Sequence, residues 1–124
     1  MPGKFLFLSI LILLLGVPQA QAARFSGEYL LHVCGSDKNG KELVAGGHIA
    51  CQAYIAGVLD YHTLITSLGT SPSVEFCVPE TIDMNTLQKN IESYVYKNRS
   101  QHVGFVAAPG VALALYSFYP CKGK

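Results

Sequence analysis

Tryptophan is absent from this 124-residue chain, and charged side chains make up only 14% of it. The nine Lys and Arg residues are nearly balanced by eight Asp and Glu residues, so no broad positive field is available to attract a nucleic-acid backbone. No basic cluster is interleaved with aromatic residues, as a single-strand-binding platform requires. Half of the residues are hydrophobic, which excludes a disordered tail. The composition therefore indicates a compact protein or a protein-binding module.

Familiar catalytic motifs are also missing. The sequence contains no GxSxG, HExxH, Walker or EF-hand pattern, and its four histidines, His32, His48, His62 and His102, lie in separate segments. Asp60 and His62 stand two positions apart, where side chains of a helix point in different directions. We therefore expect no enzymatic activity, no cofactor and no metal site, and we keep a small hydrolase as the weakest alternative.

The N-terminus has the three parts of a secretory signal peptide. Lys4 precedes an apolar run over residues 5–17, and Pro18 is followed by the small residues Ala20 and Ala22. The run is shorter than the roughly 20 residues that a membrane-spanning helix needs. We predict a signal peptide over residues 1–22 and one domain over residues 23–124, with an uncleaved membrane anchor as the alternative.

Four cysteines, Cys34, Cys51, Cys77 and Cys121, lie in the predicted domain. Their spacing matches neither a CxxC redox motif nor paired zinc ligands. In an exported domain of about 100 residues, whose core is small, covalent cross-links add stability. We expect two disulfides, and free or metal-bound thiols are the alternative.

The hydrophobic pattern predicts an all-α domain, a small disulfide-bonded bundle of about four helices. Ser26 and Asp83 are good N-cap residues for the first and third helices. Pro109 interrupts the last apolar stretch, which implies a kink or a late start for that helix. The expected helices cover residues 26–35, 48–68, 83–97 and 103–119.

Two helices carry informative faces. In the second, apolar residues cover most of the circumference, so we expect it to be central, and Ala53, Ala56 and Gly57 form a small-residue patch that another helix could approach. Packing within the monomer and a homodimer both remain possible for this patch. In the third, Met84, Leu87, Ile91, Tyr94 and Val95 define the buried face, and Asn85, Gln88, Lys89, Glu92 and Lys97 the solvated one.

Alternating antiparallel helices suggest which cysteines meet. The first helix ends at Cys34 near the start of the second at Cys51, whereas the third begins just after Cys77 and the fourth ends at Cys121. Of the three possible connectivities, we therefore prefer Cys34 with Cys51 and Cys77 with Cys121.

The same residues resemble the Rap/Tai family of immunity proteins along nearly the whole predicted domain. The matching features are Ser26-Gly27, Leu30-Leu31 and Cys34, then Cys51 with Tyr54-Ile55-Ala56-Gly57-Val58 and Asp60, then Phe76-Cys77-Val78-Pro79, and finally Ala114-Leu115 with Tyr119-Pro120-Cys121. This resemblance implies a periplasmic, helical protein that inhibits a type VI secretion effector, often a peptidoglycan amidase. It also implies a homodimer that occludes the effector's cleft.

For the effector contact, we expect an exposed polar loop held by rigid flanking helices. Residues 98–102 offer Arg99, Gln101 and His102 as hydrogen-bond donors, and arginine is favoured at interface hot spots. Residues 66–75 are the alternative, and an ordinary solvated turn is the plainest explanation of either loop. A small periplasmic chaperone or structural helical protein is the alternative function.

Overall fold

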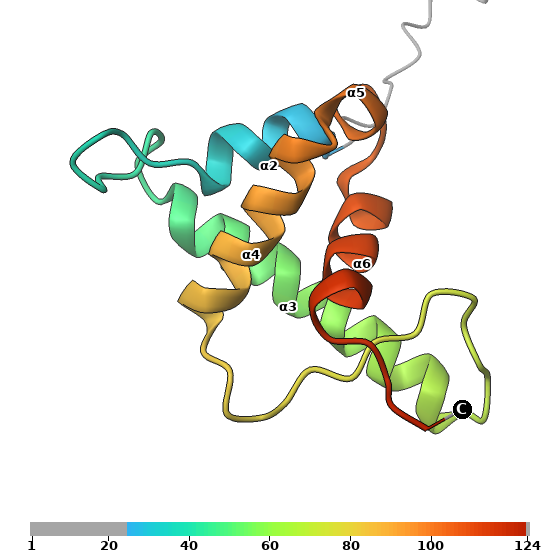
Figure 1. The fold of residues 1–124 in the computed structure, drawn as a ribbon. Coiled ribbons are helices and arrows are strands. Elements are labelled where there is room, and N and C mark those ends of the chain that lie inside the picture. The colour runs from blue at the N-terminus through green and yellow to red at the C-terminus, as the bar shows by residue number, and fades with distance from the viewer. Residues whose placement is uncertain (1–24, 124) are drawn as a thin grey trace, which may run out of the picture.

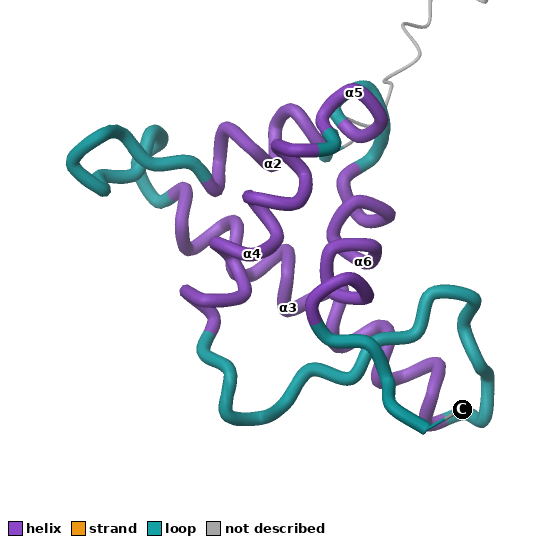
Figure 2. The backbone as a smooth tube through the Cα atoms, in the orientation of Figure 1, coloured by secondary structure: helices purple, strands orange, loops and turns teal. Residues whose placement is uncertain are grey.

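The computed structural model describes residues 25–123, which form five helices and no strand. Figures 1 and 2 show their arrangement and the loops between them. The predicted all-α class is confirmed, whereas the predicted signal peptide lies outside the described residues. None of the described helices combines the length and apolar character required to cross a membrane. The helices are α2 (Gly27–Cys34), α3 (Gly47–Ser67), α4 (Met84–Lys97), α5 (Arg99–His102) and α6 (Ala107–Phe118).

Two helices begin where their capping residues predict. The Ser26 hydroxyl accepts a hydrogen bond from the Tyr29 N–H at 3.1 Å, at the start of α2. The Asp83 carboxylate accepts bonds from the Thr86 hydroxyl at 2.8 Å and the Thr86 N–H at 3.0 Å, at the start of α4. These bonds lower the pKa of Asp83 and satisfy backbone donors that the helix leaves unpaired.

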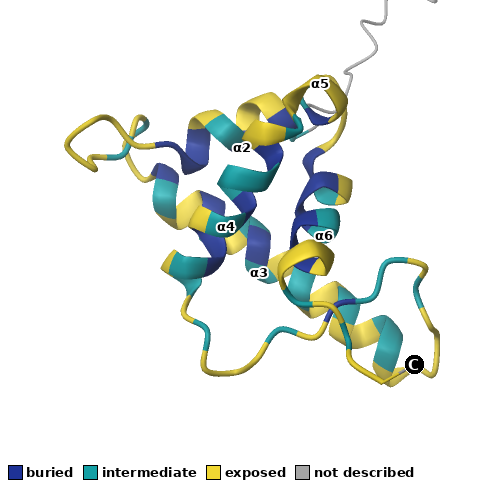
Figure 3. Cartoon of the chain, viewed as in Figure 1, coloured by how far each residue is buried: buried dark blue, intermediate teal, exposed yellow. Residues whose placement is uncertain are grey.

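The core lies where α2, α4 and α6 meet the first half of α3. In Figure 1, α4 and α6 run side by side in opposite directions, and α2 lies across their upper ends. Figure 3 shows the buried faces of these helices turned toward one another. The predicted apolar face of α4 is confirmed, because Leu87, Ile91 and Val95 are buried. Their main buried partners are Leu30, Val33, Ile55, Phe76, Val111, Ala114 and Leu115.

The last helix starts late, which is one of the two outcomes that Pro109 allows. Helix α6 begins at Ala107, so Pro109 lies in its first turn, where a missing backbone donor costs little. The preceding residues form α5, a single turn that the sequence did not predict as a helix.

Both preferred disulfides are present, Cys34–Cys51 and Cys77–Cys121. Cys34 and Cys51 are fully buried, whereas Cys77 is exposed. Next to the second disulfide, the Cys77 N–H donates to the Tyr119 carbonyl at 2.8 Å. The second disulfide therefore fastens the long connection before α4 to the chain that follows α6.

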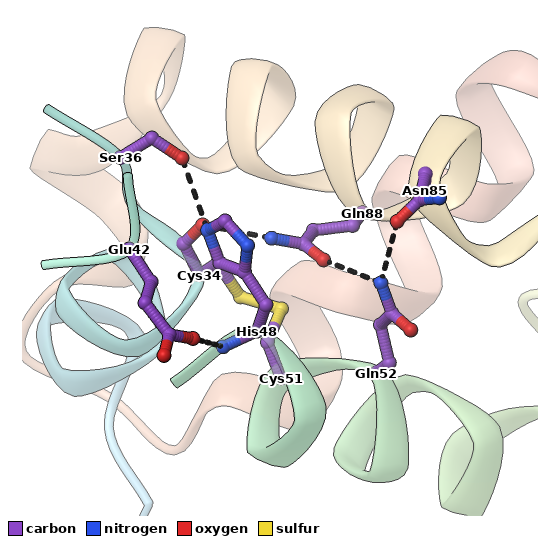
Figure 4. The surroundings of a disulfide bond; sticks show 8 residues. All are labelled: Cys34, Ser36, Glu42, His48, Cys51, Gln52, Asn85 and Gln88. Atoms are coloured by element: carbon purple, nitrogen blue, oxygen red, sulfur yellow. Dashed lines mark hydrogen bonds between the residues drawn. A yellow bond between two sulfur atoms is a disulfide. The ribbon is translucent and has the colours of Figure 1, made fainter. Parts of the chain in front are cut away.

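Gln88 corrects the prediction of a solvated face on α4, because its side chain is only 5% exposed. Its amide nitrogen donates to the Cys34 carbonyl at 2.8 Å, and its amide oxygen accepts from Gln52 at 2.9 Å. The same Gln52 nitrogen donates to Asn85 at 2.9 Å, as Figure 4 shows. This network joins α2, α3 and α4 beside the buried disulfide and satisfies a polar side chain that burial would otherwise penalise.

Helix α3 is not central, contrary to prediction. Only Gly47, Cys51 and Ile55 are buried in it, and all three lie in its first half. Its second half extends beyond α4 and α6, as Figure 3 shows by the exposed and half-buried residues there. Apolar residues around a helix show that it could be buried on all sides. Here the other helices are too short to cover the whole length of α3.

The connection between α2 and α3, residues 35–46, extends away from the helices in Figure 1, and we call it the finger. It supplies the cap for α3, because Gly46 stands at the N-cap position without a side chain. The Glu42 carboxylate accepts the Gly46 N–H at 2.8 Å and the His48 N–H at 3.2 Å. These backbone hydrogen bonds lower the pKa of Glu42.

Glu42→Gln should remove an acid-sensitive part of the stability. Because folding lowers the Glu42 pKa, its carboxylate stabilises the fold above the unfolded pKa of about 4.3, and this contribution is lost as the pH falls through the folded pKa. Urea unfolding should therefore show the variant less stable than the wild type at pH 7, with a smaller difference at about pH 3. A stability difference that stays constant between these pH values would contradict the assigned role.

Candidate interaction surfaces

The predicted contact segment forms a corner between α4 and α6, which we call the α5 corner (residues 98–102). Asn98 ends α4: its backbone N–H and its side-chain amide both donate to the Tyr94 carbonyl, at 3.0 and 2.9 Å. The chain then makes one further turn, closed by the bond from the Val103 N–H to the Arg99 carbonyl at 3.0 Å. The corner is therefore held in place by backbone hydrogen bonds.

Arg99 and Gln101 are exposed on the α5 corner, as predicted. The Arg99 guanidinium lies 4.5 Å from the centre of the Tyr96 ring, and its Nη1 donates to the Tyr96 carbonyl at 2.9 Å. A guanidinium carries five N–H donors, so this arrangement orients the group and leaves donors for a partner. Arg99 is thus a preorganised cation on an exposed aromatic residue.

His102 differs from the prediction, because its side chain is buried and only 8% exposed. Its ring centre lies 5.9 Å from that of Tyr94, and a Cβ atom on Gly110 would lie 3.3 Å from the His102 Nδ1. The absence of a side chain on Gly110 therefore lets α5 approach α6 closely. Nε2 of His102 has no hydrogen-bond partner among the described residues. The expected exposure of His102 is therefore wrong, and its ring instead anchors the corner.

A second surface is an apolar groove beside the second half of α3, with a cavity volume of about 640 Å³. Tyr54, Gly57 and Tyr61 line it from α3, Val74 from the following connection and Pro109 from α6. A Cβ atom on Gly57 would meet nothing within 4 Å, so no element of the described chain packs there. The monomer therefore leaves the predicted small-residue patch open at Gly57.

The groove continues into an exposed row along α3, which we call the α3 stripe: Ile49, Ala53, Gly57, Tyr61, Leu64 and Leu68. Residues three or four positions apart share a helix face, so the first five follow one side of α3 and Leu68, the C-cap residue, continues the row. Ile49, Tyr61 and Leu68 are 77%, 65% and 72% exposed. An exposed apolar row of this length is typical of a surface that contacts another protein.

His62 fixes the connection that borders the groove. Its ring stacks on Phe76 with ring centres 3.8 Å apart, and its Nε2 accepts the Phe76 N–H at 3.4 Å. The predicted alternative contact, residues 66–75, therefore runs from the end of α3 to a segment held by this pair and by the Cys77–Cys121 disulfide. The exposed residues of this segment are therefore attached to a part of the chain that is held in place.

The histidines do not assemble a reactive centre in the described residues. The His48 Nε2 lies 3.0 Å from the Ser36 hydroxyl, but the Glu42 carboxylate bonds to the His48 backbone rather than to its ring (Figure 4). No three His, Cys, Asp or Glu side chains in residues 25–123 are grouped so that they could hold a metal ion.

Comparison with known families gives a match that covers almost all of the described chain. The model of the Rap1a immunity proteins matches residues 26–121. The chain belongs to the Rap1a immunity protein family. The search of curated proteins found no match. The resemblance inferred from the cysteines and their neighbouring motifs is thereby confirmed at the level of the family.

Truncation of His102 and of Arg99 to alanine should change the stability of the protein by different amounts. His102→Ala would leave a cavity between α4 and α6, so we expect it to reduce the free energy of unfolding by about 2 kcal/mol or more. Arg99→Ala removes an exposed side chain and should change it by less than about 0.5 kcal/mol. Chemical denaturation of both variants checks this, and equal losses of stability would show that the two roles are wrongly assigned.

Proposed function

We propose that this Rap1a family member is a periplasmic immunity protein that binds and inhibits a type VI secretion effector, a peptidoglycan amidase, by occluding its active-site cleft. The family match over residues 26–121 carries this proposal. The predicted signal peptide and the two disulfides fit a protein that works outside the cytoplasm.

Inhibition by occlusion requires only a stable surface that fits the effector. The α5 corner supports such a role, because Arg99 is oriented by Tyr96 before binding and loses little conformational freedom when it binds. In this proposal Arg99 and Gln101 contact the effector, His102 positions them from below, and residues 66–75 are the alternative contact.

The exposed α3 stripe gives some support to the other candidate function, a small periplasmic chaperone. A chaperone would use such a surface to slow the aggregation of unrelated unfolded proteins, whereas an immunity protein would bind one effector at a fixed ratio. Aggregation assays with two unrelated unfolded proteins separate these functions.

The effector can be recovered from the secreted proteins of the same organism with the purified mature chain and identified by mass spectrometry. We expect the pure effector's peptidoglycan hydrolysis to be inhibited saturably at a fixed molar ratio. Arg99→Ala should weaken binding by about 2 kcal/mol or more, roughly thirtyfold, whereas Lys97→Ala removes a nearby exposed cation and should have little effect. Equal affinities of the two variants would move the contact to residues 66–75.

We also propose that the protein acts as a homodimer whose two copies meet along the α3 stripe. The small residues Ala53 and Gly57 leave a shallow depression in the helix surface between the larger side chains of Ile49 and Tyr61. When two helices cross, rows of side chains spaced four residues apart pack into such depressions. A second copy would cover the groove that the monomer leaves open at Gly57. Loss of Lys4 with the signal peptide would leave the chain neutral, so charge repulsion between copies would be small.

Gly57→Leu tests the dimer without a clash in the monomer. The new side chain would enter open space and should raise helix stability slightly, but it would prevent a second α3 from approaching. Sedimentation should show a dimer dissociation constant raised about tenfold or more, whereas Thr63→Leu, at an exposed position on another side of α3, should leave it unchanged. A monomeric wild type at high micromolar concentration would rule out the dimer.

A further inference from the structure

The finger is larger than the fold requires, because its two ends already touch. The Cα atoms of Cys34 and Cys51 are 5.1 Å apart, and a Cβ atom on Gly47 would lie 2.6 Å from the Val33 carbonyl oxygen. Helices joined at such close ends need a connection of only about two to eight residues. The finger spans residues 35–46 and places almost none of them in the core. Compact loops of this kind, with adjoining ends, are frequently functional.

The finger is ordered by hydrogen bonds within it and by the bonds of Ser36 and Glu42 to His48 at the start of α3. Backbone bonds join the Leu43 N–H to the Gly35 carbonyl at 3.1 Å and the Asp37 N–H to the Lys41 carbonyl at 2.8 Å. The Asp37 carboxylate accepts the Asn39 and Lys41 N–H groups at 2.8 and 3.0 Å. The tip therefore has one defined shape before any partner binds, which lowers the entropy cost of binding.

The acidic side chains of the finger are occupied by hydrogen bonds, whereas its lysine side chains are not. Its two acidic side chains, Asp37 and Glu42, use their carboxylates to bind backbone N–H groups of the finger and of the α3 start. Lys38 and Lys41 are exposed, and neither forms an ion pair with any residue that the structure describes. The finger therefore offers a partner two unpaired ammonium groups on a narrow, ordered loop.

We propose that the finger is a second contact for the effector, and that Lys38 and Lys41 bind a cluster of carboxylates on the effector surface. This inference rests on the proposed function. A protein partner is favoured over an anionic membrane, because two lysines contribute only about 1 kcal/mol each at a lipid surface and residues 38–41 include no apolar anchor. The half-exposed Leu43 is a single apolar side chain, which is a weak membrane anchor by itself.

The test reverses two charges on the finger and two elsewhere. The finger variant is Lys38→Glu with Lys41→Glu, and the control is Lys89→Glu with Lys122→Glu, which changes the net charge equally at exposed positions on α4 and the C-terminal segment. The probe is the purified effector recovered as described above. We expect the finger variant to bind about tenfold more weakly or worse, the control to bind within about threefold of the wild type, and Lys38→Arg with Lys41→Arg to retain affinity.

Further measurements separate the alternatives. Wild-type affinity should fall as salt rises, the finger variant should show a weaker salt dependence, and all variants should share the wild-type melting temperature. Equal affinities of finger variant and control would overturn the finger contact while leaving the proposed function intact. A wild type that does not inhibit the effector would overturn both. Wild-type binding to phosphatidylglycerol vesicles that is lost in the finger variant, with unchanged effector affinity, would assign the finger to membranes instead.

Discussion

The junction at Cys34 is the constraint on which the rest of this fold depends. Helix α2 has only 8 residues, and isolated helices shorter than about 12 to 15 residues are marginal in water. The Cys34–Cys51 disulfide closes a separation of 17 residues, which stabilises the fold by roughly 3 kcal/mol on the loop-entropy model. Gln88 adds a buried hydrogen bond to the Cys34 carbonyl, worth about 1 kcal/mol net. Together they fix α2 against α3 and α4, and they close the base of the finger.

A second constraint decides which surface stays open. The Cys77–Cys121 disulfide and the stacked pair of His62 and Phe76 fasten the connection between α3 and α4 along one side of the groove. This connection packs against α3 through Phe76 but does not cover the side that carries Gly57. The second half of α3 is therefore held by this connection on one side, while the α3 stripe remains exposed to a protein partner.

The sequence predicted the features that depend on local chemistry. Ser26 and Asp83 cap helices because their side chains accept hydrogen bonds from the first turn. The spacing of Leu87, Ile91 and Val95 defines the buried face of α4. The cysteines pair as expected because antiparallel helices bring their ends together. It failed where burial depends on distant partners. The sequence pattern places Gln88 on the solvated face, because the Cys34 carbonyl that it binds belongs to another helix. His102 was expected to be exposed, because the close approach of α5 to α6 at Gly110 cannot be seen in the sequence. Helix α3 was expected to be central, because its apolar pattern does not show how short the neighbouring helices are. The α3 stripe could have been found only by asking which helices are long enough to cover it.

The proposed binding surfaces lie away from the core, which has a consequence for how specificity can change. Lys38 and Lys41 on the finger, and Arg99 and Gln101 on the α5 corner, are exposed, and substitutions at such positions usually alter stability by less than about 0.5 kcal/mol. Their supports, the buried disulfide under the finger and His102 under the corner, belong to the core. A chain built this way can exchange the residues that meet a partner while the supports keep them in place. In the proposed function, this separation lets recognition of the effector diverge at little cost in stability.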